Sequence, residues 1–217
     1  MTKFLHKELS LAASVLSYIF TAAAFLTLVP GYPILLGAFF ITLGIFYSFQ
    51  SMRENNDIMY MLLLPVSKAD IVKSKYLFVL FIESCGFTLM TVLTAVRMTF
   101  LKDAAVYTSN ALMCANLTFL GFALLIFGLF NFVFVGGFFK TAYYFGKPFV
   151  KYCIISLVVI AAAETLRHLP GMESLNSFGF ENLPTQGIAL CVGIAAFAVL
   201  TLCGIKKSVR DFEKTDL

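Results

Sequence analysis

Charged residues are scarce in this chain, and tryptophan is absent. Its 217 residues include 16 Lys or Arg, 12 Asp or Glu and no Trp, whereas 60% are hydrophobic. The mean hydropathy is +0.90. A soluble domain is about half apolar and about a quarter charged, and a chain this short cannot bury so much apolar surface. The composition therefore excludes a soluble enzyme, a disordered protein and a nucleic-acid-binding domain, and it indicates a polytopic α-helical membrane protein.

Motifs of catalysis are also missing. The sequence contains no H-E-x-x-H, no G-x-S-x-G and no G-x-x-x-x-G-K-[ST] phosphate loop. The odd number of cysteines and the lack of C-x-x-C indicate buried small hydrophobes, not disulfides or metal ligands; they are Cys85, Cys114, Cys153, Cys191 and Cys203. We therefore expect no enzyme activity, no metal and no cofactor in this chain, and any ATP that drives it must be hydrolysed by another chain.

Long apolar blocks are the main feature that is present. Each is close to the ~20 residues of a transmembrane helix, so we predict an all-α fold with six transmembrane helices in one domain, 1–217. The blocks are Leu11–Val29, Ile34–Phe49, Tyr76–Val96, Ala111–Val133, Cys153–Leu166 and Gly187–Ile205. Pro30 and Pro33 predict a tight hairpin between the first two. A cleaved signal peptide is the alternative for the first block, but its apolar run continues to Val29, which favours a retained span.

The basic residues predict the orientation. With the N-terminus inside, the segments 1–10, 50–75, 134–152 and 206–217 hold 13 of the 16 Lys and Arg residues. Lys and Arg accumulate in cytoplasmic segments, so both termini are expected in the cytoplasm, with an even number of spans. Segment 1–10 is then an interfacial helix leading into span one, and 206–217 is a cytoplasmic tail.

The inner loop 50–75 carries two signals for a helix start. Two pairs fit the capping box, with a proline between them: Ser51 with Glu54, Ser67 with Asp70, and Pro65. They predict a short helix over 52–64 and a second helix that begins near Lys68 and continues into span three.

The predicted short helix has an acidic start and an apolar end. A helix that only anchors to the anionic inner leaflet usually carries Lys and Arg on its polar face. This one carries Glu54 and Asp57, so we predict that it docks into a groove of a cytoplasmic protein, with simple membrane anchoring as the alternative.

Residues 53–77 resemble the corresponding loop of small ABC transporter permeases of the type-two exporter class. Within this class they are similar to short six-span subunits of Gram-positive bacteria that export phenol-soluble modulins and related peptides. The resemblance implies a coupling helix that sits in a cleft of a separate ATPase subunit, which holds ATP and Mg²⁺. It also implies a second permease subunit, identical or not, and an amphipathic substrate. The implied coupling residues are Glu54, Asp57, Ile58, Met61, Leu62, Leu63, Leu64 and Pro65.

Two of the polar residues inside the predicted spans are candidates for a role in the membrane. A charge at the bilayer centre costs about 3 kcal/mol on insertion scales, so Glu83 either serves a pathway or interface or is satisfied by a neighbouring helix. Asn116 is expected to hydrogen-bond another helix. The alternatives to an exporter subunit are a secondary transporter or channel that uses Glu83, and a non-transporting immunity or sensor protein.

Two weaker patterns are the spacing of glycines and the composition of segment 138–148. Gly37 and Gly44 are seven residues apart, as are Gly121 and Gly128, and each pair places two small residues on one helix face, which suits close helix packing. Segment 138–148 mixes aromatic residues with Lys140 and Lys147, which is typical of an amphipathic segment on the inner membrane surface.

Overall fold

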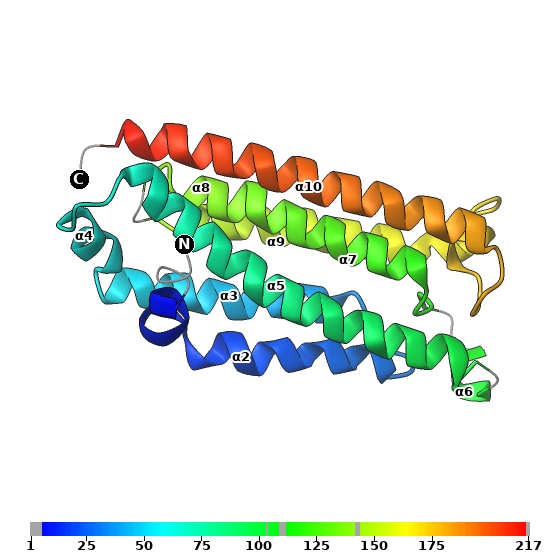
Figure 1. Ribbon diagram of the computed structural model, residues 1–217. Helices are drawn as coiled ribbons and strands as arrows, with labels where there is room; N and C mark the ends of the chain where they lie inside the picture. The colour runs from blue at the N-terminus through cyan, green and yellow to red at the C-terminus, as the bar shows by residue number, and fades with distance from the viewer. Residues whose placement is uncertain (1–5, 103, 109–111, 142–143, 216–217) are drawn as a thin grey trace.

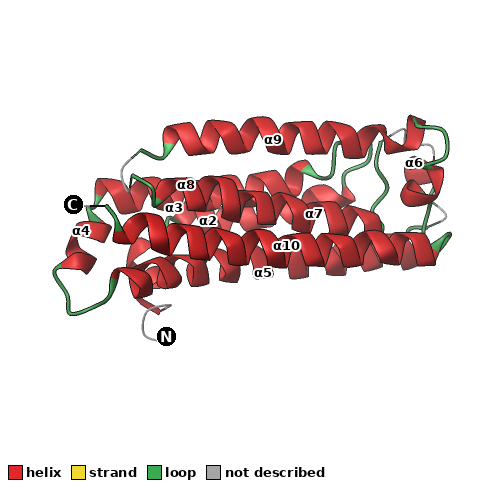
Figure 2. Cartoon of the chain, turned by 90° about the horizontal axis from the view of Figure 1, so that it is seen from above, coloured by secondary structure: helices red, strands yellow, loops and turns green. Residues whose placement is uncertain are grey.

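Helices make up all the regular structure that can be described. The computed structural model describes residues 6–102, 104–108, 112–141 and 144–215, and no strand occurs within these ranges (Figure 2). The predicted segment 1–10 and tail 206–217 lie partly outside them, as does Ala111. In chain order the elements are η1 (Glu8–Ala12), α2 (Val15–Thr21), η2 (Ala22–Leu28), α3 (Leu36–Glu54), α4 (Asp57–Leu62), α5 (Lys68–Thr99), α6 (Ala105–Thr108), α7 (Leu117–Leu129), η3 (Phe130–Val135), α8 (Gly136–Phe138), α9 (Gly146–Thr165), η4 (Leu166–His168), η5 (Glu173–Asn176) and α10 (Leu183–Glu213).

The long helices lie side by side in one bundle, whose two ends differ (Figure 1). Element η1, α4 and the C-terminal end of α10 lie at one end, whereas α6 and the beginning of α10 lie at the other. We call the first the α4 end. The predicted inner segments therefore gather at a single end, as the basic residues required.

Four helices are long and apolar enough to cross a membrane: α5, the continuous run Leu117–Phe138, α9 and α10. The apolar segment Val15–Leu28 is shorter, and α3 has 19 residues. Each of the six predicted apolar blocks thus contains a helix. The count of six membrane spans and the direction of the termini remain predictions.

Helix α5 runs through the whole bundle as one element of 32 residues. At its far end the Arg97 Nη1 atom donates to the carbonyl oxygen of Thr27 at 2.7 Å, and its guanidinium lies 4.2 Å from the centre of the Tyr107 ring. The Tyr107 hydroxyl in turn donates to the Leu28 carbonyl at 2.9 Å. The guanidinium thus joins α5 to the end of η2 and to α6.

The start of α5 confirms one of the two predicted capping boxes. The Ser67 hydroxyl accepts from the Asp70 backbone N–H at 3.1 Å and donates to the Asp70 carboxylate at 2.6 Å. This local exchange satisfies an amide that the first helical turn leaves without a partner. It explains why α5 begins at Lys68, as predicted.

The other capping box is wrong. Ser51 lies inside α3, which continues to Glu54, and the short helix covers only Asp57–Leu62 instead of 52–64. The chain reverses at Asn55 and Asn56, and Asn56 adopts a left-handed conformation with φ of 51°. Asparagine tolerates this conformation better than most residues, so the turn rather than Ser51 sets where the short helix begins.

The chain between segment 1–10 and the first predicted span is not helical throughout. After η1 the chain becomes extended at Ala13 and Ser14. The Ser14 side chain accepts from the Leu16 N–H at 3.3 Å, and its own N–H donates to Ser48 Oγ at 2.8 Å. The first bond caps the beginning of α2, and the second joins this point to α3. The predicted hairpin of spans one and two is confirmed by the packing of α2 and η2 against α3.

Asn116 precedes α7, the helix of the fourth predicted span, instead of lying within a helix. Residues 112–116 form a loop, and α7 begins at Leu117. The Asn116 side chain caps α7 by accepting from the Phe119 N–H at 2.9 Å, and it donates to the carbonyls of Leu175 and Ser177. Asparagine is a preferred helix cap, which explains this position at the end opposite α4.

The cysteines differ from the prediction that all five are buried. Cys114 is buried and Cys153 is half-buried, whereas Cys85, Cys191 and Cys203 are exposed on the outer surface of the bundle. In a membrane this surface faces lipid, which suits a small apolar thiol as well as a protein core does. None of the five forms a disulfide.

Candidate functional site

Helix α4 crosses the end of the bundle between α3 and α5 (Figure 1). The Asn55–Asn56 turn leads into it, and the stretch up to Ser67 leads out of it into α5. Helix α4 is part of the connection between two long helices, so its position depends on both of them.

The two faces of α4 have opposite surroundings. Ile58 and Met61 are buried and belong to the hydrophobic core, and Leu62 is half-buried against it. The other side is apolar but exposed, with Tyr60 at 67% and Leu63 at 82% of their full accessible surface. We call this exposed set, which continues into the residues just after the helix, the outer face of α4; it comprises Met59, Tyr60, Leu63, Leu64 and Pro65. The predicted coupling residues are thus divided, because Ile58 and Met61 hold the helix in place while Leu63, Leu64 and Pro65 face outward.

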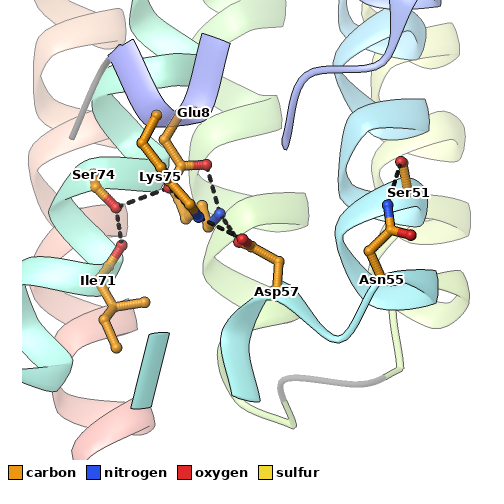
Figure 3. A network of polar contacts seen from close by, with 8 residues as sticks. Glu8, Ser51, Asn55, Asp57, Ile71, Ser74 and Lys75 are labelled. Atoms are coloured by element: carbon orange, nitrogen blue, oxygen red, sulfur yellow. Dashed lines mark hydrogen bonds and ion pairs between the residues drawn. The ribbon is translucent and has the colours of Figure 1, made fainter. Parts of the chain in front are cut away.

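An ionic network fastens α4 to the rest of the bundle (Figure 3). The Asp57 carboxylate accepts from the ammonium groups of both Lys7 and Lys75. Lys75 Nζ also donates to Glu8 Oε2 at 2.6 Å. Glu8 further accepts from the Ser74 hydroxyl and from Lys7 at 3.4 Å. The network joins α4, α5 and the N-terminal segment, and Glu8 and Lys75 in it are completely buried.

Glu54 and Asp57 therefore have different environments, although the sequence presents them as one acidic tip. Glu54 is exposed at the end of α3 and accepts from the Gln50 side chain at 3.0 Å. Asp57 is engaged inside the bundle by two lysines. Only Glu54 presents its carboxylate at the surface beside the outer face of α4.

Lowering the pH is expected to weaken the attachment of α4. Burial raises the pKa of Asp57, but the charges and hydrogen bonds of Lys75 and Lys7 outweigh it and lower the pKa below its ordinary value of 3.8. A carboxylate with a lowered pKa contributes stability above the ordinary value and loses it as the pH falls through the folded pKa. The melting temperatures of the wild type and Asp57→Asn should therefore differ at about pH 7 and converge below about pH 4. A difference that stays constant over this range would contradict the ionic attachment.

Glu83 lies in a second polar cluster, deep in the bundle and separate from α4. Its Oε2 atom accepts from the Asn131 amide at 2.9 Å, and the same amide donates to Thr201 at 3.1 Å. Tyr76 donates to the Asn131 carbonyl at 2.9 Å, where η3 departs from α-helical geometry. A neighbouring helix thus satisfies one oxygen of Glu83. Its Oε1 atom and Asn131 Oδ1 have no partner among the described residues.

A scan against protein-family models matches residues 4–213 to a family described as ABC-2 family transporter protein. The chain belongs to the ABC-2 transporter family. This match covers almost every element of the bundle, α4 and its ionic network included. Comparisons with curated proteins and with solved structures give no match.

Members of the ABC-2 transporter family are membrane transport components and are not themselves catalytic. The family implies association with an ABC ATPase, which fits the lack of a phosphate loop in this chain. Among the described residues no group of three or more His, Cys, Asp or Glu side chains is arranged to hold a metal ion. The predicted resemblance to an ABC permease is thus confirmed at the level of the family, and the similarity to exporters of phenol-soluble modulins stays a prediction.

Three residues of this ABC-2 permease were not predicted as part of the site: Lys7, Glu8 and Lys75. In the sequence the two lysines count only toward the charge bias of the inner segments. Lys7 contacts Asp57, which is 50 residues away, and Lys75 contacts Glu8, which is 67 residues away. No local pattern in the sequence indicates these contacts. The sequence feature that could have indicated this network is Glu8, a single acidic residue among the lysines of the N-terminal segment.

Proposed function

We propose that this chain is the permease subunit of an ATP-driven exporter that moves amphipathic peptides or other amphiphiles outward. Separate ATPase subunits would hold ATP and Mg²⁺, and a second permease subunit would complete the pathway. The observation that carries the proposal is the outer face of α4, an exposed apolar surface on a helix that is fastened to the bundle.

The outer face has the features of a docking surface. Leu63 and Tyr60 are among the most exposed large apolar side chains in the described residues. Contiguous apolar patches on a surface indicate protein or membrane contacts, and aromatic residues are enriched in protein interfaces. The exposed carboxylate of Glu54 beside the patch favours a protein partner, because the inner leaflet repels it.

The attachment of α4 supports a role in transmitting movement. Asp57 is linked through Lys75 to the first turns of α5, and Ile58 and Met61 are packed in the core. A partner that displaces α4 therefore also displaces α5, because buried ion pairs and close packing resist independent movement.

The proposed topology has six spans with the α4 end in the cytoplasm of a bacterial cell. Helices α2 and η2 together and α3 would cross beside the four longer spans. The lysines and arginines at the α4 end agree with this orientation. An ATPase in the cytoplasm would then meet the outer face directly.

A binding experiment tests this function. The permease is purified with the ABC ATPase proposed as its partner, and Tyr60→Asp and Leu63→Asp are compared with Val106→Asp, which changes a 59% exposed apolar residue on α6 at the opposite end. A buried interface residue that dominates binding contributes 2 kcal/mol or more, so we expect at least a tenfold loss of ATPase affinity for the first two variants. We expect no change for Val106→Asp.

Two results would overturn the proposal. One is unchanged ATPase binding and unchanged permease-stimulated ATP hydrolysis in Leu63→Asp. The other is flux driven by an ion gradient through the purified chain alone and abolished in Glu83→Gln, which would support a secondary transporter.

A further inference from the structure

A basic pocket lies at the α4 end, and none of its lining residues belongs to the ionic network. Its volume is about 630 Å³. Four lysines from three parts of the chain line it, together with an apolar wall that includes Phe132 and Pro148. The lysines are Lys140, Lys147, Lys151 and Lys207.

The charges of these lysines are not compensated by the described part of the protein. No acidic residue lines the pocket, and none of the four lysines forms an ion pair with a described acid, whereas Lys7, Lys73 and Lys75 do. Lys147 and Lys151 stand four residues apart on α9, where like charges repel. Lys207 lies 5.0 Å from the centre of the Phe132 ring. An anion in the pocket would relieve this repulsion.

The backbone fixes the shape of the pocket. Gly137 allows α9 to approach closely, since a Cβ atom there would lie 2.8 Å from Pro148 Cβ. The first turn of α9 contributes Lys147 and Pro148 to the lining. A helix N-terminus carries partial positive charge, which adds to that of the lysines.

The surface next to the pocket is apolar. Val150, Ile154 and Val158 recur at four-residue spacing along α9, and all three are more than half exposed. They form a stripe that begins at Val150, between Lys147 and Lys151, and runs toward the middle of the bundle. A ligand that fills both regions therefore has an anionic head and a long apolar tail.

We propose that this pocket binds the headgroup of an anionic phospholipid from the cytoplasmic leaflet. The phosphate lies among the four lysines, and an acyl chain lies along the exposed stripe of α9. Basic pockets between transmembrane helices on the cytoplasmic side are suited to such headgroups. The site is independent of the outer face of α4 and of ATP hydrolysis.

The experiment compares two double variants that remove the same charge. Lys147→Gln with Lys151→Gln changes the pocket, whereas Lys206→Gln with Lys214→Gln changes exposed lysines outside the pocket lining at the same end. Each protein is purified in detergent, and its binding of phosphatidylglycerol and of phosphatidylcholine is measured by native mass spectrometry. Each lysine near the surface contributes about 1 kcal/mol to lipid attraction, so the pocket variant should bind phosphatidylglycerol at least tenfold more weakly. The control should stay within about twofold of the wild type.

Three outcomes would overturn the proposal. Equal losses in both double variants would indicate general surface attraction. An affinity for inorganic phosphate or glycerol 3-phosphate that matches the one for phosphatidylglycerol would indicate a soluble anion. Unchanged phosphatidylglycerol binding in the pocket variant would place the lipid elsewhere. Melting temperatures in detergent without added lipid show that each variant is folded, and a failure of ATPase binding would not affect any of these readings.

Discussion

Replacing Lys75 by methionine is expected to lower the stability of the folded protein by about 3–5 kcal/mol, the cost of breaking a buried ion pair from one side. Lys75 is completely buried between two carboxylates. Its removal leaves Glu8 buried with only the Ser74 hydroxyl and Lys7 at 3.4 Å. The melting temperature in detergent should fall on the order of 10 °C.

Lys73→Met is the matched control for this change. Lys73 stands on the same helix, but it is 53% exposed and its nearest carboxylate, that of Asp70, is 3.9 Å away. Exposed pairs of this kind contribute about 0–1 kcal/mol, so the control should melt close to the wild type.

A second substitution separates charge from packing. The double variant Lys75→Met, Glu8→Gln removes the buried carboxylate that Lys75→Met alone leaves without its main partner. Part of the decrease in melting temperature seen in the single variant should therefore be reversed. If the double variant is no more stable than Lys75→Met alone, the buried charge of Glu8 is not the cause of the loss.

The second large effect is expected at the contact between α7 and α10. A Cβ atom on Gly193 would lie 2.4 Å from the carbonyl oxygen of Gly121 and 2.5 Å from its Cα atom. Both are backbone atoms, so no side-chain rotation can relieve the clash, and the two helices must separate. Gly193→Ala should therefore destabilise the protein by about 3 kcal/mol, at the upper end of the usual cost of overpacking.

Gly187→Ala is the control in the same helix. Nothing lies within 4 Å of a Cβ atom at that position. Alanine is the better helix former by up to about 1 kcal/mol, so this variant should melt at or slightly above the wild-type temperature. Size-exclusion elution and melting in detergent measure both variants, and equal behaviour of the two would contradict close packing at Gly193.

Local signals in the sequence predicted much of the fold. Ser67 and Asp70 marked the beginning of α5, because a capping box needs only residues in one turn. Gly121 and Gly128 predicted a close helix contact, and both lie against the backbone of α10. Their counterpart Gly193 was not predicted, since nothing in the sequence states which helices become neighbours.

Other features depend on the three-dimensional arrangement and were mispredicted or missed. Ser51 and Glu54 have the spacing of a capping box, but the packing of α3 keeps them helical. Asp57 was grouped with Glu54, because the lysines that surround it come from distant segments. The sequence could not show which apolar residues of α4 face outward. A helix of six residues has fewer than two turns, which is too short for an amphipathic pattern to be recognised.

The length of α5 has a mechanical consequence. Its 32 residues form a rod of about 48 Å, with the ionic attachment of α4 at one end and the guanidinium of Arg97 at the other. Because such a rod is rigid, a small tilt imposed at the α4 end becomes a displacement of several ångströms at the opposite end. Arg97 contacts the ends of η2 and α6 through Thr27 and Tyr107, so this displacement would reach the loops at the end of the bundle opposite α4.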